Sequence, residues 1–256
     1  MLLKKLTWAG VLIKSGETVV LVDPLGNTPG NQDKPFAAKL GNAQETFIDL
    51  KGIQKPNVIL ITHIHPDHFD PISIKEAFGE DIPVLIPTAS IEIGKKFGLK
   101  NVIGVSIGDT KTFGDFRVSP TYSADGYGSP QVSWVIEGAG KRIIHSGDTL
   151  WHGNWWRIRG EFGKFDVACL PINGAVLDVA GLSEQTNHHA CMIPEEAVEA
   201  AKILGANHLV PIHFKTFHNE PFYIETPNAV PRLLQKAKER EVNVTLLQPD
   251  QNLELL

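Results

Sequence analysis

The sequence predicts a mixed α/β fold, because short apolar strands alternate with helical segments and polar residues close several of the strands. Strands are expected over Val58–Ile61, Pro83–Ile86 and Val102–Val105, and helices over Pro71–Phe78 and Ala89–Phe97 lie between them. Such alternation is typical of an α/β arrangement. The chain of 256 residues is long enough for one large core, and no linker or repeat divides it. We therefore expect a single domain spanning residues 1–256.

The N-terminal region reads as a hairpin followed by a long loop. Leu6–Lys14 and Thr18–Val22 are expected to be strands that Ser15 and Gly16 join, and Asp23 with Pro24 ends the second strand. Residues 26–46 are rich in Gly, Asn, Gln and Pro, so we expect a loop there, with a short helix near Phe36–Leu40. Long loops of this kind often form the wall of a pocket.

End signals mark the helices. Asp70 is the expected N-cap of the first helix, Pro71 takes its first helical position and Gly79 follows its end. Thr88 is the expected cap of the second helix. A later helix over Ile193–Leu204 carries acidic residues in its first turn, where they complement the helix dipole.

The second half of the chain is expected to form further short strands. From residue 108 to residue 138 the sequence changes to strands and turns, and two later apolar runs end in polar residues. A last helix is expected over Ala229–Arg240. The expected strands are Thr112–Phe113, Phe116–Ser119, Val132–Ile136, Arg142–His145, Phe165–Pro171, His208–Ile212 and Val242–Gln248.

The composition restricts the classes of partner and the cellular compartment. The formal net charge of −5 provides no global basic field, so we expect neither nucleic acid nor an anionic membrane surface as a partner. Thr7 and Gly10 interrupt the N-terminal apolar stretch, which therefore does not read as a signal peptide. Cys169 and Cys191 are expected to be reduced, buried thiols. A cytoplasmic protein without a membrane-spanning segment fits these observations.

The segment that follows the strand Val58–Ile61 contains three imidazoles and a carboxylate within six residues: His63, His65, Asp67 and His68. A chain that leaves a strand can curl such side chains around one point. Imidazole nitrogen and carboxylate oxygen suit zinc, manganese or iron, and four groups exceed the usual protein ligands of one catalytic zinc. We therefore predict a site for two divalent ions. The alternatives are a His-rich surface turn and histidines that cap the next helix.

Two further polar residues stand directly after buried strands. Asp148 lies in a Ser-Gly-Asp-Thr element in which Gly147 allows a tight turn, and His213 ends the strand His208–Ile212. Each residue alone could serve as a turn or capping residue. Together with the histidine cluster, they favour a larger metal site.

The ordered set of H-x-H-x-D-H, G-D-T and a late strand-terminal histidine resembles the metallo-β-lactamase superfamily. The resemblance implies a four-layer αββα sandwich, in which two mixed sheets pack face to face with helices outside. It also implies that His63 and His65 hold one ion, that Asp67, His68 and His213 hold the other, and that Asp148 lies between the two. These motifs cover most of the chain.

One ligand expected from that resemblance is missing. Many members carry a further histidine between the two motifs, but Ser119–Gly126 contains none. Asp125 is the best substitute, since a carboxylate can replace an imidazole and makes the site richer in oxygen; Tyr122 is a weaker candidate. The alternative is that Asp125 belongs only to a turn, which would leave the first ion weakly bound.

In lacking this histidine, the sequence resembles the ascorbate-6-phosphate lactonase-like branch of that superfamily. That branch has an aspartate region where others have the histidine, and it carries a His-Ser-Gly-Asp element like residues 145–148, with aromatics after it. Trp151, Trp155 and Trp156 correspond to those aromatics. The resemblance does not transfer the substrate. His145 lies on a strand beside the site and could be a hydrogen-bond partner of a ligand; the alternative is a core histidine with its own partners.

Several residues are candidates for contact with substrate. Trp151 could line an aromatic pocket wall, although tryptophans at helical spacing more often belong to a core. His188 and His189 lie in a polar loop where related enzymes can place a substrate-contacting histidine, but exposed loop histidines are common. Lys215 and Arg157 are the cations nominated to bind a phosphate or carboxylate.

The hypothesis from sequence is a metal-dependent hydrolase of a small ester or lactone, phosphorylated or not. The two metals would lower the pKa of a shared water to yield a bridging hydroxide. Asp148 would bridge the metals, and Asp67 would orient the nucleophile or move a proton. The rivals are a metal-dependent phosphodiesterase and, from another class, a binding or scaffold module with a defective metal site. The expected partner is a small-molecule substrate, and a homo-oligomer is left open.

Overall fold

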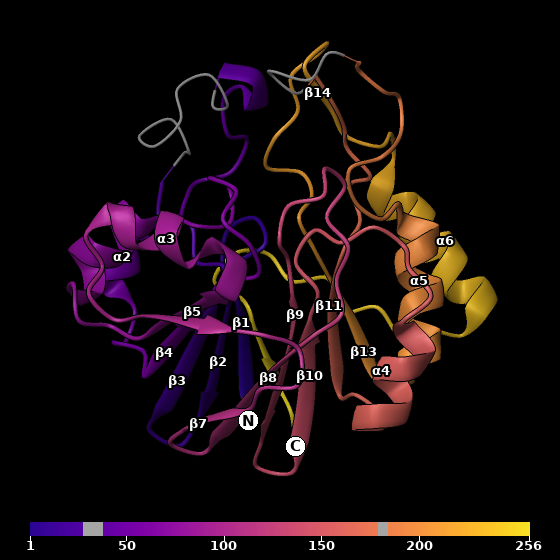
Figure 1. The fold of residues 1–256 in the computed structure, drawn as a ribbon. Helices are drawn as coiled ribbons and strands as arrows, with labels where there is room; N and C mark the ends of the chain where they lie inside the picture. The colour runs from indigo at the N-terminus through magenta and orange to yellow at the C-terminus, as the bar shows by residue number, and fades with distance from the viewer. Residues whose placement is uncertain (28–37, 179–183) are drawn as a thin grey trace.

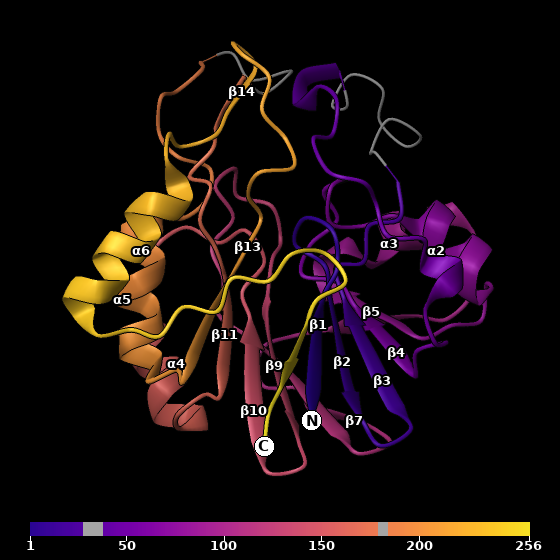
Figure 2. The same ribbon diagram turned by 180° about the vertical axis from the view of Figure 1, so that it is seen from behind.

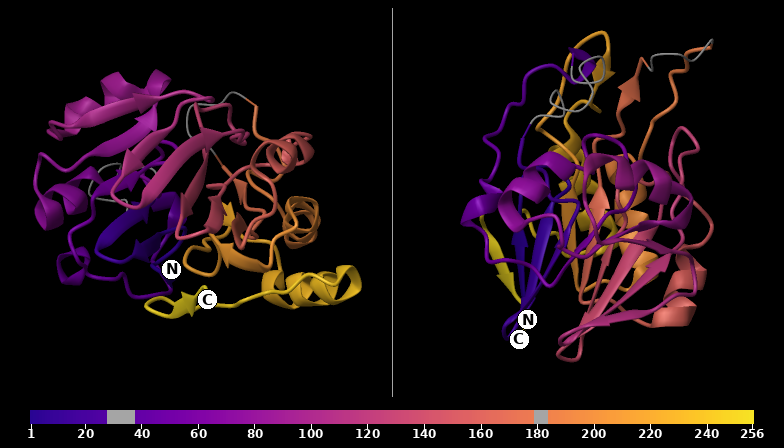
Figure 3. Two further views of the ribbon diagram at one scale, coloured as in Figure 1. Left: turned by 90° about the horizontal axis from the view of Figure 1, so that it is seen from below. Right: turned by 60° about the vertical axis from the view of Figure 1, so that its left-hand side comes forward.

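Two β-sheets pack face to face, and helices cover the outer face of each sheet (Figure 1). The computed structural model describes residues 1–27, 38–178 and 184–256. Seen from behind and from below, the two sheets remain side by side with the helices outside them (Figures 2 and 3). The expected four-layer αββα sandwich is confirmed.

The first sheet has seven strands in the order β15-β1-β2-β3-β4-β5-β6. The pairs from β15 to β3 are antiparallel, and those from β3 to β6 are parallel. The strands are β1 (Leu2–Lys5), β2 (Val11–Ser15), β3 (Thr18–Val22), β4 (Val58–Leu60), β5 (Val84–Pro87), β6 (Val102–Val105) and β15 (Asn252–Glu254).

The second sheet has six strands in the order β13-β11-β10-β9-β8-β7, of which β13, β11 and β10 run parallel. A separate two-stranded ribbon pairs β12 (Val176–Leu177) with β14 (Tyr223–Ile224). The sheet strands are β7 (Lys111–Phe113), β8 (Phe116–Thr121), β9 (Ser133–Gly138), β10 (Lys141–His145), β11 (Val167–Pro171) and β13 (His208–Ile212).

Helices α2 and α3 lie on the outer face of the first sheet, and α4, α5 and α6 lie on that of the second (Figure 1). Three apolar clusters correspond to this layering, one between the sheets and one beneath each helical layer. The helices are α2 (Pro71–Phe78), α3 (Ile91–Gly94), α4 (Trp155–Phe162), α5 (Pro194–Leu204) and α6 (Ala229–Arg240), with short 3-10 turns η2 (Leu50–Gly52), η3 (Thr88–Ser90) and η4 (Lys95–Phe97). No helix in the described part of the chain is both long and apolar enough to cross a membrane.

The capping signals read from the sequence are confirmed for α2. Asp70 accepts a hydrogen bond from the Ser73 amide at 3.0 Å, Pro71 occupies the first turn and Gly79 ends the helix with φ 89°. The helix thus begins and ends where the local sequence predicts, because the capping residues satisfy its free backbone groups.

Some expected elements are wrong. The strand expected over Leu6–Lys14 is broken by a tight turn, because Trp8 adopts a left-handed φ of 60°, and β2 begins only at Val11. The helix expected over Ala89–Phe97 is divided into η3, α3 and η4. The segment Val242–Gln248 forms only an isolated bridge from Val244 to Leu209. The short helix expected near Phe36–Leu40 falls partly outside the described residues.

The pairing of strands explains where the polar strand ends meet. Because β3 and β4 run parallel, Asp23 and the histidine-rich loop leave the first sheet at the same edge. Because β10, β11 and β13 run parallel, Asp148 and His213 leave the second sheet together. These four chain exits lie at the upper end of the sandwich in Figure 1.

Candidate metal centre

The loop after β4 curls tightly, as the spacing of its polar residues indicates. The amides of His68 and Phe69 both donate to the His65 carbonyl at 2.9 Å. At the start of the loop, the Thr62 amide and hydroxyl donate to the Asp23 carboxylate at 2.8 and 2.6 Å. The loop is therefore fixed at both ends, and its polar side chains turn toward the gap between the sheets.

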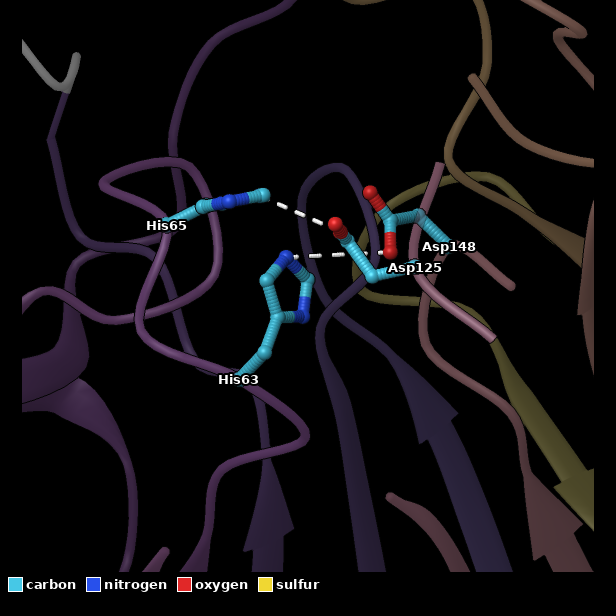
Figure 4. A group of neighbouring side chains, drawn as sticks. All are labelled: His63, His65, Asp125 and Asp148. Atoms are coloured by element: carbon cyan, nitrogen blue, oxygen red, sulfur yellow. Dashed lines mark ion pairs between the residues drawn. The ribbon is translucent and has the colours of Figure 1, made fainter. Parts of the chain in front are cut away.

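The first of two ligand groups consists of His63, His65, Asp125 and Asp148, which we name the first metal position (Figure 4). One potential ligand atom from each side chain lies within 4.8 Å of the others. His63 Nε2 lies 3.7 Å from Asp148 Oδ1, and His65 Nδ1 lies 3.7 Å from Asp125 Oδ1. The side chains come from the β4 loop and from two loops of the second sheet.

Asp125 reaches this position because backbone groups hold its other oxygen. The amides of Tyr127 and Ser129 both donate to Asp125 Oδ2 at 2.8 Å, so Oδ1 is left to face His65. Gly126 passes so close to Ala190 that an added Cβ would lie 2.3 Å from its carbonyl oxygen. The segment that lacks the expected histidine therefore brings a carboxylate into the first metal position, beside His65.

The second group, which we name the second metal position, consists of Asp67, His68 and His213. Asp67 Oδ2 lies 3.8 Å from His68 Nε2 and 3.5 Å from His213 Nε2. All three side chains are at most 6% exposed, so little water reaches them.

Asp148 lies between the two positions. Its Oδ1 faces His63 Nε2 at 3.7 Å, and its Oδ2 faces His68 Nε2 at 3.9 Å. The preceding Gly147 has φ 65°, and a Cβ there would lie 2.9 Å from the Thr62 hydroxyl oxygen. Only glycine tolerates both conditions, so the Gly-Asp element is what brings this carboxylate so near the β4 loop.

The donor set fits metal ions. The Nε2 atoms of His63, His68 and His213 are buried and have no hydrogen-bond partner among the described residues. Buried polar atoms are normally paired, since an unpaired group loses its hydration without compensation. Divalent ions that accept imidazole nitrogen and carboxylate oxygen would satisfy all three atoms. Zinc, manganese and iron all accept these donors.

Each of these histidines has a partner on its other ring nitrogen. Asp23 lies 2.8 Å from His68 Nδ1, Asn173 Oδ1 lies 3.2 Å from His213 Nδ1, and the Thr62 hydroxyl lies 3.0 Å from His63 Nδ1. Such outer partners orient a ligating imidazole and select its tautomer.

Burial and mutual attraction shift the ionisation of the cluster. Burial raises the pKa of Asp148 to about 8, and a bound cation would favour its ionised form. Burial alone would lower the pKa of His68, but Asp67 and the hydrogen bond to Asp23 raise it to about 9. Burial lowers the pKa of His213 to about 4, so this imidazole is neutral, as metal binding requires.

The residues nominated for substrate contact lie outside both ligand groups. Trp151 is 37% exposed and packs edge-on against Trp156, while His188 is exposed. His189 Nδ1 lies 2.6 Å from the Gly174 carbonyl oxygen. Lys215 Nζ lies 3.6 Å from a Glu45 carboxylate oxygen. Their roles in binding substrate stay predictions.

The structure distinguishes the remaining candidates of the sequence. His145 Nε2 lies 2.7 Å from the Ala9 carbonyl oxygen and its Nδ1 accepts from the Gly147 amide, so both ring nitrogens of His145 are taken up by backbone groups. Trp155 is fully buried in the core beneath the helices. Arg157 lies 4.7 Å over the Tyr122 ring, which leaves neither residue in a ligand group.

Among the residues that support the ligands, the sequence reasoning assigned no such role to Trp8, Asp23 and Asn173. Asp23 follows a buried strand just as Asp148 does, so the same signal could have identified it. Asn173 likewise follows the buried strand β11. Trp8 had no such signal, because its segment read as the middle of a strand.

Comparisons with known proteins agree with the fold described above. The family described as "Beta-lactamase superfamily domain" matches residues 18–214. A UPF0173 metal-dependent hydrolase of Thermus thermophilus is 32% identical over 256 residues, covering 96% of each chain. Among solved structures, the metallo hydrolase Igni18 of Ignicoccus hospitalis matches 100% of this chain and 99% of its own, with a TM-score of 0.72 and 22% identity. An isothiocyanate hydrolase from Delia radicum gut bacteria matches 100% and 99%, with a TM-score of 0.76 and 15% identity.

Proposed function

Because this chain belongs to the beta-lactamase superfamily and is similar over its length to metal-dependent hydrolases, we propose that it hydrolyses a small ester or lactone with two divalent ions, zinc or manganese, as cofactors. The observation that carries the proposal is the position of Asp148, whose Oδ1 lies 3.7 Å from His63 Nε2 and whose Oδ2 lies 3.9 Å from His68 Nε2. A carboxylate placed in this way suits a pair of ions better than a single ion.

The seven polar side chains divide the work of holding the ions. His63, His65 and Asp125 would hold one ion and Asp67, His68 and His213 the other, with Asp148 shared. When bound, such ions supply Lewis acidity and lower the pKa of water toward neutrality. The donors are positioned before substrate arrives, because their outer nitrogens and oxygens are already hydrogen-bonded.

Asp67 is placed to orient the nucleophile or the leaving group as an ionised carboxylate. Burial would raise its pKa, but the charge of His68 and the nearby His213 imidazole, 3.5 Å from Asp67 Oδ2, outweigh burial and hold the pKa below the usual range of a carboxyl. Asp67 therefore remains ionised and can accept a hydrogen bond from a nucleophile or a leaving group.

The surroundings of Lys215, one of the two cations nominated to bind substrate, favour an uncharged ester. Lys215 Nζ lies 3.6 Å from Glu45 and 3.5 Å from the Gln248 side-chain oxygen, so its charge is partly compensated. A phosphorylated substrate would have to compete with that carboxylate for Lys215. Trp151, which is partly exposed, offers an apolar surface for the body of a small substrate. We therefore favour a carboxylic ester or lactone over a phosphodiester.

A panel of lactones, carboxylic esters and phosphodiesters, assayed with added Zn²⁺ or Mn²⁺, tests the proposal. We expect turnover of a lactone or ester, and loss of that turnover in His65→Ala. His208→Ala is the matched control, because His208 lies at the opposite end of β13 from the metal centre and its Nδ1 lies 2.9 Å from the Thr245 hydroxyl oxygen. Faster cleavage of phosphodiesters than of esters would favour the alternative function, a metal-dependent phosphodiesterase. Less than one bound ion per chain, together with no hydrolysis of any substrate, would favour a binding module.

A further inference from the structure

The turn between β1 and β2, residues 6–10, contacts the second metal position through Trp8. The Leu6 amide donates to the Gly10 carbonyl at 2.9 Å and the Gly10 amide donates to the Thr7 carbonyl at 3.0 Å, which closes the turn. The buried ammonium group of Lys5 donates to the carbonyls of Leu6 and Trp8. This turn joins the antiparallel strands β1 and β2.

The same turn connects the two sheets. Although it belongs to the first sheet, its Ala9 carbonyl oxygen lies 2.7 Å from His145 Nε2 at the end of β10. The His213 amide, at the end of β13, donates to the Trp8 carbonyl at 3.3 Å. The turn thus belongs to the first sheet by its strands and is hydrogen-bonded to the ends of two strands of the second sheet, one of which carries the candidate ligand His213.

Trp8 contacts two of the three residues of the second metal position. Its indole Nε1 donates to Asp67 Oδ2 at 3.2 Å, the oxygen that also faces His68 and His213. Its ring centroid lies 4.0 Å from that of His213, with an interplanar angle of 40°. The indole therefore restricts both the rotation of the Asp67 carboxylate and the tilt of the His213 imidazole.

A purely apolar role does not explain this arrangement. Trp134 lies in the same core between the sheets, is equally buried, and has an indole nitrogen without a partner. Trp8 instead reaches the Asp67 carboxylate from a left-handed backbone conformation, φ 60°, which is unfavourable for a residue with a side chain. Burial of an apolar ring alone would not require this backbone conformation. Its presence indicates that the turn holds the indole N–H toward Asp67.

We infer that Trp8 is a positioning residue for the second metal position, where its indole N–H sets the orientation of Asp67 toward the ion. The inference rests on the proposed two-metal function. The first metal position receives no contact of this kind from Trp8, so the effect of removing the N–H is confined to one of the two ions. Outer partners of metal ligands typically change affinity by about 10- to 100-fold.

Crossed variants measure the two positions separately. In a His65→Ala background the second metal position remains intact, and we expect Trp8→Phe to weaken Zn²⁺ binding by about 10- to 100-fold in competition with a chromophoric chelator. In a His213→Ala background the first metal position remains, and Trp8→Phe should leave Zn²⁺ affinity unchanged within about twofold. Trp134→Phe, which removes the same ring atoms from the same core without removing a hydrogen bond, should change neither affinity.

Three results would overturn the inference. These are an equal loss in both backgrounds, no loss in either, or the same loss in Trp134→Phe. If the protein without substitutions binds no Zn²⁺ at all, the proposed function fails together with the inference. If that protein binds two ions and Trp8→Phe does not alter either, only the inference fails.

A second measurement does not depend on the stability of the Trp8 variant. In the His65→Ala protein, the indole N–H resonance of Trp8 should shift when Zn²⁺ is added, because its acceptor Asp67 becomes a ligand. In the His213→Ala protein the same resonance should stay in place. A Trp8 resonance that does not respond in the His65→Ala protein would contradict the inference.

Discussion

The two metal positions are made of similar side chains but are supported differently. At the second metal position every ligand is at most 6% exposed and has an outer partner from elsewhere in the fold: Trp8 for Asp67, Asp23 for His68 and Asn173 for His213. At the first metal position the His65 side chain is 28% exposed, and both it and Asp125 depend on the loop of residues 125–129. The second position is part of the core, whereas the first is partly built on a loop.

This difference indicates how one centre can combine affinity with access. Ligands fixed by buried hydrogen bonds lose little conformational freedom when an ion binds, so the second metal position should hold its ion more tightly. A more exposed ion is easier for substrate to reach. We therefore expect the first metal position to be the one at which water and substrate exchange, and the predictions below test this asymmetry.

The largest effect is expected for Asp148→Ala, which removes the one carboxylate that faces both positions. Turnover should fall by more than about 100-fold, the upper effect of an outer partner alone, and the affinity for both ions should fall. Metal content and steady-state rates check this. Asp166→Ala is the control, because Asp166 binds the Arg142 amide at the far end of the same sheet. An effect on only one ion would show that Asp148 is not shared.

Asp23→Asn should weaken the second metal position and alter the pH dependence of stability. The pKa of His68 is raised from 6.5 to about 9, so the stability that its protonated form provides is fully present below pH 6.5 and is lost as the pH rises through 9. In metal-free protein we expect Asp23→Asn to be less stable by about 2 kcal/mol below pH 6.5, with the difference shrinking toward pH 9. Denaturant titrations across that range measure the difference.

Asp49→Asn serves as the control for that series, because Asp49 only caps a short exposed turn. A difference between Asp23→Asn and the protein without substitutions that stays constant from pH 6 to pH 9 would contradict the assigned role of Asp23.

Asp125→Ala should affect only the first metal position. We expect the affinity for that ion to fall by about tenfold, since one oxygen ligand and the anchor of its loop are lost, while the other ion is retained. Asp109→Ala, which removes a carboxylate that accepts a backbone amide in another exposed turn, is the control. If Asp125→Ala instead lost the more tightly held ion, the first metal position would be the tighter one, contrary to the expectation above.

The smallest effect is expected for Trp151→Ala. Loss of a partly exposed aromatic surface should raise KM by about threefold with kcat and metal content unchanged, as for a residue that contributes apolar contact to substrate. Trp156→Ala, an adjacent and more exposed tryptophan, provides the comparison. An equal change in both variants, or a fall in kcat, would argue against substrate contact by Trp151.

The sequence by itself indicated an α/β fold and the ligand candidates within residues 63–68. Local signals were sufficient there, because buried strands, capped helices such as α2 and the spacing within that segment depend on neighbours along the chain. The αββα sandwich and the candidates Asp125, Asp148 and His213 came from the resemblance of the whole motif set to a known superfamily.

The tertiary structure alone decided which residues support those ligands. The turn at Trp8, the reach of Asp125 to His65 and the bond from Asp23 to His68 join residues that lie 45 or more positions apart, so no local pattern contains them. His145 shows the converse, since its position in the sequence suggested a ligand partner and its long-range contact with Ala9 gave it a backbone role instead. Contacts of this kind form only when the sheets have packed, because the strand pairing and the pleat decide which strand ends meet.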